Sequence, residues 1–174
     1  MRLVTTLALV VAVMALAARA EDAKKDASKV VLKSPDGKKS YDLGKLTADG
    51  PVLVRLTCAC SGCDAELPYF QKLQAAYKEK GLTTLAVFQE EPASLESYVT
   101  QKDIQFLWLA DPKGATWKTF EAKTMPTNVL IDKGGKVVKV VAGCTKDGKN
   151  AQALSSEIAK LLNTQEAQIA ETKK

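Results

Sequence analysis

Three closely spaced cysteines stand where an apolar strand-like run gives way to a helical pattern, and they are the residues of this chain best suited to chemistry. They are Cys58, Cys60 and Cys63, and a fourth cysteine, Cys144, follows much later. The chain of 174 residues contains no histidine. This excludes Ser-His-Asp and Cys-His catalysis and histidine-ligated haem. Any chemistry must therefore use cysteine, carboxylates, lysine or tyrosine.

The spacing of Cys60 and Cys63 is that of a redox-active dithiol. An apolar run at 51–56 precedes the pair, and apolar residues at helical spacing follow it. A thiol at a helix N-terminus meets unpaired N–H groups and the positive end of the dipole, which stabilise its thiolate. The second sulfur lies one helical turn further on and can close a small disulfide ring. We therefore predict that Cys60 is the exposed attacking thiolate and Cys63 the resolving thiol.

The rest of the pattern predicts one mixed β-sheet flanked by helices. A turn sequence at 34–37 separates two short strands at 29–32 and 40–43, which favours an N-terminal hairpin. Apolar runs predict further strands at 51–56, 82–88, 106–109, 128–131 and 136–141. Helical periodicity predicts helices between the cysteines and Gly81, and at 94–102, 116–120 and 150–162. This order is typical of an α/β fold with a single sheet.

A second motif, Met125-Pro126-Thr127 directly before a strand, extends the pattern. With it, the chain from Lys29 to Leu162 resembles the thioredoxin-fold superfamily, and within it the TlpA-type exported thiol–disulfide oxidoreductases. The resemblance implies a thioredoxin-like fold with an N-terminal β-hairpin. It also implies that Pro126 is a cis-proline facing the cysteines. Met125 would then offer backbone groups that pair with a substrate strand.

Glu66 and Arg55 are two charged residues near the dithiol in the sequence. Glu66 matches an acidic position that the family places near its cysteines, so the resemblance makes it the candidate to move the proton of Cys63. A glutamate that only complements the helix dipole is the alternative, and both remain open. Arg55 stands where many relatives have Asp or Asn. We expect its head group to reach solvent or to pair with an acid.

Cys58 and Cys144 are additional to the dithiol, and the resemblance places Cys144 at the same end of the sheet. They could form a structural disulfide with each other, or a second redox pair that relays electrons to Cys60 and Cys63. All four thiolates could instead bind Cu(I) or Zn(II). Either extra cysteine could also be a small buried apolar residue. We expect one other strand to separate the strands of these two cysteines, which places the strands about 10 Å apart. This is beyond the limit of about 7 Å between the Cα atoms of a disulfide and argues against direct pairing. We favour a non-metal role, because exported thiols are exposed to oxidation.

The N-terminus has the pattern of a secretory signal peptide, with Arg2, an apolar stretch and Ala18-Arg19-Ala20. We predict cleavage after Ala20, a flexible spacer at 21–28, a thioredoxin-like domain at 29–163 and a polar tail at 164–174. Cleavage removes Arg2 and Arg19, which lowers the formal net charge from +5 to +3. That charge is too small to indicate nucleic-acid binding. We expect a periplasmic or secreted protein that is not an integral membrane protein after cleavage.

Together these features predict an exported thiol–disulfide oxidoreductase that needs no cofactor, since the dithiol itself carries the electrons. The resemblance implies protein disulfide substrates and a membrane or exported electron-donor protein. A thiol-dependent peroxidase is one alternative. It is disfavoured because that family has Thr or Ser three residues before its reactive cysteine, where this chain has Cys60, and because it typically lacks a proline like Pro126. The other alternative is a non-enzymatic soft-metal-binding module that uses Cys58, Cys60, Cys63 and Cys144.

Overall fold

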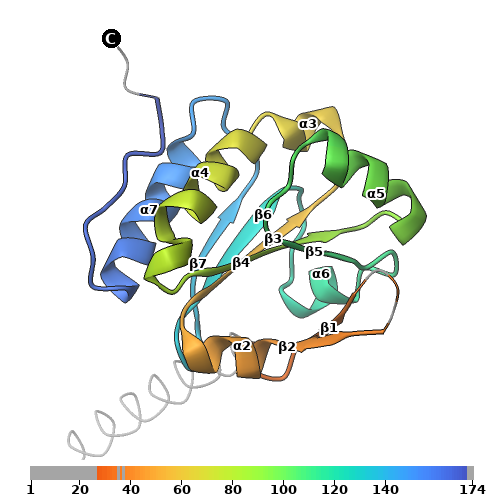
Figure 1. The fold of residues 1–174 in the computed structure, drawn as a ribbon, viewed down its shortest axis with the longest axis horizontal. Coiled ribbons are helices and arrows are strands. Elements are labelled where there is room, and N and C mark those ends of the chain that lie inside the picture. The colour runs from red at the N-terminus through yellow and green to blue at the C-terminus, as the bar shows by residue number, and fades with distance from the viewer. Residues whose placement is uncertain (1–26, 35, 37, 172–174) are drawn as a thin grey trace, which may run out of the picture.

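The computed structural model describes residues 27–34, 36 and 38–171 (Figure 1). The predicted signal peptide and residues 21–26 of the predicted spacer lie outside this part. The described elements are β1 (Val31–Lys33), β2 (Ser40–Asp42), α2 (Leu43–Asp49), β3 (Val52–Thr57), α3 (Ser61–Asp64), α4 (Leu67–Tyr77), η1 (Lys78–Lys80), β4 (Thr83–Phe88), α5 (Pro92–Gln101), β5 (Leu107–Ala110), α6 (Ala115–Thr119), β6 (Thr127–Ile131), β7 (Val137–Ala142) and α7 (Lys149–Leu161).

A five-stranded mixed sheet forms the centre of the molecule, in the order β5-β4-β3-β6-β7. Strands β3, β4 and β5 run parallel, whereas β6 is antiparallel to both β3 and β7. Strands β1 and β2 form the separate antiparallel hairpin. The predicted mixed sheet and N-terminal hairpin are thus confirmed. Because β3 and β4 are parallel neighbours, their C-terminal ends lie at the same edge of the sheet, next to the cysteines.

Helices cover both faces of this sheet, and each face has its own apolar core (Figure 1). Helices α4, α5 and α7 pack on one face, where Leu53, Ala86 and Leu130 point. Helices α2 and α6 and the hairpin pack on the other face, where Val52 and Val54 point. Every residue of β3 is buried. Such burial on both faces explains why β3 is apolar apart from Arg55 and its last residue, Thr57.

The structure differs from the predicted elements in three places. Residue Leu43 begins α2, where the sequence analysis had a strand. The Asp42 side chain caps this helix by accepting a hydrogen bond from the Lys45 N–H at 3.3 Å. The predicted helix after the cysteines is split into α3 and α4. Pro68 lies in the first turn of α4 and has no N–H, so it favours a new helix start over continuation.

The third difference is the segment after α7, which contacts the domain (Figure 1). Ile169 is buried, and its N–H donates to the Gln152 side chain at 2.7 Å. The Ala167 N–H donates to the hydroxyl of Tyr77 at 2.8 Å. Residues 164–171 therefore lie along α7, although their composition is polar. Within the described part of the chain, no helix has the length and apolar character needed to cross a membrane.

Candidate active site

The end of β3 places three cysteines in one short loop and the turn that follows. Cys58 comes directly after β3, and Cys60 caps the N-terminus of α3. The carbonyl of Cys60 accepts the N–H groups of Cys63 and Asp64 at 3.0 and 3.1 Å. Cys60 is exposed, whereas Cys63 is only 3% exposed. This contrast supports the predicted roles of attacking and resolving thiol, which remain predictions.

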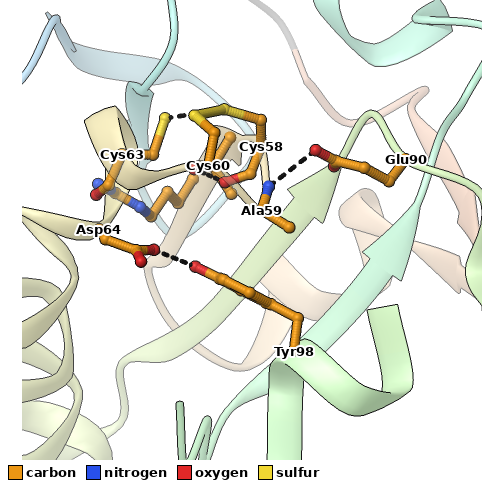
Figure 2. The surroundings of a disulfide bond; sticks show 9 residues. Cys58, Ala59, Cys60, Cys63, Asp64, Glu90 and Tyr98 are labelled. Carbon is orange, nitrogen blue, oxygen red and sulfur yellow. Dashed lines mark hydrogen bonds between the residues drawn. A yellow bond between two sulfur atoms is a disulfide. The ribbon is translucent and has the colours of Figure 1, made fainter. Parts of the chain in front are cut away.

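The sulfur atoms of Cys58, Cys60 and Cys63 form a compact cluster in which all lie within 4.8 Å of one another (Figure 2). A disulfide joins Cys58 to Cys60. The sulfur of Cys63 lies 3.3 Å from that of Cys58, and Cys63 and Cys144 are free. The structure thus pairs Cys58 with its near neighbour, whereas the sequence analysis considered Cys144 as its partner. It also brings Cys58 into contact with the predicted resolving thiol.

Glu90 anchors the loop between the bonded cysteines, and the sequence analysis did not identify it. The Ala59 N–H donates to Glu90 Oε1 at 2.8 Å (Figure 2). The Gln89 N–H donates to the Thr57 carbonyl at 3.3 Å, which extends the pairing of β3 with β4 to this loop. The other carboxylate oxygen of Glu90 is buried and has no hydrogen-bond partner among the described residues. An acid just after a strand parallel to β3 was the available sequence signal.

A buried polar network lies beneath the dithiol. Arg55, 1% exposed, forms an ion pair with Glu66 at 2.9 Å and donates to Asn128 Oδ1 at 3.1 Å. Its second terminal nitrogen donates to the Cys63 carbonyl at 3.1 Å. The guanidinium also lies 5.2 Å from the ring centre of Phe70. Of the two expectations for Arg55, pairing with an acid is confirmed and access to solvent is wrong.

Glu66 stands at the N-cap of α4 and is 1% exposed. Its Oε2 binds Arg55, and the Asn128 amide donates to the same oxygen at 3.4 Å. Its Oε1 is buried and lacks a hydrogen-bond partner among the described residues. The side chain makes no hydrogen bond that caps the helix. The side chain is therefore held by Arg55 and Asn128 and does not cap its own helix, and its proton-transfer role remains a prediction.

Asp64 connects α3 to α5. Tyr98 donates its hydroxyl to one carboxylate oxygen at 2.6 Å (Figure 2). The ammonium of Lys102 lies 2.6 Å from the other oxygen. Partial burial acts to raise the pKa of Asp64, but Lys102 and Tyr98 outweigh it and hold the pKa below the usual 3.8. Burial and the same hydrogen bond raise the pKa of Tyr98 above its usual value. The turn that carries Cys63 is thus fixed to α5 by a charged contact.

We expect Asp64→Asn to lower the free energy of unfolding by roughly 1 kcal/mol or less at pH 7, because partly exposed ion pairs contribute little. The carboxyl of Asp64 has a folded pKa below 3.8, so its stabilisation is complete above the unfolded pKa and is lost as pH falls through the folded pKa. The stability gap between wild type and variant should therefore shrink below about pH 4. Urea unfolding at a series of pH values measures it. A gap that widens towards low pH would contradict this assignment.

The motif around Pro126 lies at the same end of the sheet. The Met125–Pro126 peptide bond is cis, Pro126 is buried and Met125 is half-buried. Thr127 pairs with Leu56 near the end of β3, which brings the motif close to the cysteine loop. The Pro126 carbonyl accepts the Gly143 N–H at 2.8 Å. The proposed contribution of Met125 and Pro126 to substrate binding remains a prediction.

Cys144 follows β7 and lies outside the cluster of three sulfurs. It is an exposed residue with a free thiol. Partial burial of the sulfur raises its pKa, and the Glu66 carboxylate adds to the effect. The four-thiol metal site considered from the sequence is therefore reduced, among the described residues, to a group of three cysteines.

Comparisons with known proteins agree with this geometry. A family model described as Redoxin matches residues 19–155. The thiol-disulfide oxidoreductase ResA of Bacillus thuringiensis subsp. konkukian is 33% identical over 120 residues, which cover 68% of this chain and 69% of that protein. A Chlorobium tepidum structure assigned as a thiol:disulfide interchange protein DsbE has a TM-score of 0.70 at 28% identity, covering 79% of this chain and 96% of that one. The exposed lipoprotein thioredoxin Etrx1 of Streptococcus pneumoniae has a TM-score of 0.62 at 25% identity, covering 76% and 98%.

Proposed function

Because the chain belongs to the Redoxin family and is a thiol–disulfide oxidoreductase of the TlpA/ResA type, we propose that it reduces disulfides in proteins outside the cytoplasm. Cys60 acts as the nucleophile and Cys63 as a resolving thiol. The observation that carries this proposal is the exposed Cys60 beside the nearly inaccessible Cys63, at the sheet end that also holds Pro126. A large substrate can reach only the first of these thiols.

The proposed cycle begins with the reduced protein. The Cys60 thiolate attacks one sulfur of a substrate disulfide, and the other substrate sulfur leaves as a thiolate. The Cys63 thiol loses its proton to the unpaired oxygen of Glu66 and attacks Cys60, which releases the second substrate thiol. The protein ends with a disulfide, and the substrate has gained two electrons. A membrane or exported dithiol protein then returns the electrons to this site.

The predicted signal peptide supports an exported location. The pneumococcal relative is described as an exposed lipoprotein, which agrees with that location. Protein substrates are supported by the open position of Cys60 and by the half-buried Met125 at the same end of the sheet. No cofactor enters the proposed cycle, because the cysteines carry both electrons.

A soft-metal site is the second candidate, and the cluster of three sulfur atoms within 4.8 Å favours it. If all three cysteines were reduced, their thiolates would offer the ligands that Cu(I) prefers. This reading requires Cys58, Cys60 and Cys63 to remain reduced together outside the cytoplasm. The exported environment opposes that condition.

A redox titration with mass mapping tests the proposal. We expect the protein, equilibrated with thiol buffers of graded potential, to take up two electrons reversibly and to expose the Cys60 thiol when reduced. A potential near that of thioredoxin, about −270 mV, would establish a reductase, whereas about −120 mV would indicate an oxidant and overturn the proposed direction. Copurification of a stoichiometric metal with fully reduced cysteines would support the metal site instead.

A further inference from the structure

We propose that Cys58 is a second resolving cysteine, which competes with Cys63 for the mixed disulfide that Cys60 forms with a substrate. The inference rests on the proposed function of this site and adds a residue to it. In a two-cysteine site only one thiol can release the substrate. Here the structure places two further sulfur atoms within 4.8 Å of Cys60.

The position of Cys58 within the cluster carries the inference (Figure 2). Its sulfur is bonded to that of Cys60 and lies 3.3 Å from that of Cys63. Cys58 is therefore in contact with both members of the predicted dithiol. Thiol–disulfide exchange needs this kind of contact between the attacking sulfur and the disulfide. Cys58 is also half-buried, which shields it from direct attack by a large substrate more than the exposed Cys60.

The surrounding contacts hold the three sulfurs in this arrangement. Glu90 binds the Ala59 N–H between the two bonded cysteines at 2.8 Å, so the loop is attached to the end of β4. Arg55 donates a hydrogen bond to the Cys63 carbonyl at 3.1 Å. Arg55 lies in β3, and Glu90 follows β4 by two residues. These two contacts therefore restrain the segment that carries the three cysteines.

The proposed steps balance without an added oxidant. The Cys58 thiolate attacks Cys60 in the mixed disulfide, the Cys58–Cys60 bond forms, and the substrate sulfur leaves as a thiolate. The Cys63 thiolate then attacks Cys58. The Cys58–Cys63 bond forms, and Cys60 leaves as a thiolate. Each step exchanges one disulfide for another. The oxidised protein thereby regains an exposed Cys60 thiol before an external dithiol reduces it.

The test uses Ellman's reagent, an aromatic disulfide, at one equivalent per reduced chain in a Cys144→Ser background. We expect Cys63→Ser to release two equivalents of thionitrobenzoate and to contain a Cys58–Cys60 disulfide by peptide mass mapping. The matched variant Cys58→Ser/Cys63→Ser should release one equivalent and retain the adduct on Cys60. If Cys63→Ser also retains the adduct on Cys60, Cys58 does not resolve it and the proposal is wrong.

Two further measurements separate this proposal from the proposed function. Cys58→Ser, which retains Cys60 and Cys63, should resolve its adduct and still reduce a protein disulfide. If neither it nor the wild type reduces any protein disulfide, the proposed function fails, while the Ellman experiment still decides the chemistry of Cys58. Cys63→Ser with Cys144 present should behave as it does without Cys144. If Cys63→Ser releases the second equivalent of thionitrobenzoate only when Cys144 is present, Cys144 is the resolving residue and the proposal is overturned.

Discussion

Replacing Cys60 with Ser should lower the rate at which protein disulfides are reduced to that of the uncatalysed reaction. A serine hydroxyl cannot form the mixed disulfide through which exchange proceeds. Cys63 cannot take over, because it is 3% exposed, and the half-buried Cys58 is shielded from a large protein substrate. The measurement is the rate of reduction of a disulfide-linked protein by a dithiol donor, with and without the variant. Of all single substitutions in the site, this one should have the largest effect on activity.

Cys144→Ser is the matched control for this prediction. Cys144 is an exposed cysteine outside the cluster of three sulfurs, so its loss tests whether any accessible thiol affects the rate. We expect this variant to reduce the substrate at the wild-type rate. If Cys60→Ser kept the wild-type rate while Cys144→Ser lost it, the nucleophile would be Cys144, and the proposed cycle would have to be abandoned.

The sheet was predictable because its strands are apolar on both faces. The apolar run at 51–56 forms most of β3, whose residues are all buried. Its short apolar, β-branched sequence is typical of a buried strand and not of a helix. Helix α2 was not predictable in the same way. Its residues contain no extended apolar stripe, and its start depends on Asp42, whose role as an N-cap appears only once the hairpin has turned the chain.

The cysteine pairing depends on the path of the single residue, Ala59, that connects Cys58 and Cys60. Spacing alone placed Cys60 next to Cys63, because a helical turn brings those positions together. The structure instead bonds Cys58 to Cys60, and the Glu90 contact with Ala59 fixes that path. Such a contact joins residues 31 positions apart, so periodicity contains no trace of it. The sequence indicated that Cys58 could take part in the redox chemistry, but it did not predict a disulfide between Cys58 and Cys60.

The network below the dithiol was only half predictable. The sequence showed a charged residue within the most apolar strand, and physical chemistry required a partner for it. It did not show that Glu66 and Asn128 would both reach Arg55, because these positions come from α4 and β6. The sequence analysis placed Asn128 in a strand and assigned no role to its side chain. A polar residue in a fully buried strand was the signal that should have linked it to Arg55.

Arg55→Met should be the most destabilising substitution near the site. It leaves Glu66 buried without its positive partner, and breaking a buried ion pair on one side costs about 3–5 kcal/mol. Among the described residues, only the Asn128 amide, at 3.4 Å, would still donate to that carboxylate. The free energy of unfolding from urea denaturation measures the effect. A loss below about 1 kcal/mol, the size seen for exposed pairs, would show that the network is not buried in solution.

The double variant Arg55→Met/Glu66→Leu separates stability from chemistry. Replacing both members of a buried pair with apolar residues is often close to neutral, so most of the lost stability should return. If Glu66 takes the proton of Cys63, the folded double variant should resolve mixed disulfides more slowly than the wild type near neutral pH. Its resolution rate should recover at higher pH, where a thiol loses its proton without a base. Stopped-flow resolution rates across pH measure this in a Cys58→Ser background, in which Cys58 cannot resolve the mixed disulfide in place of Cys63. Wild-type rates at every pH would mean that Glu66 only supports the fold.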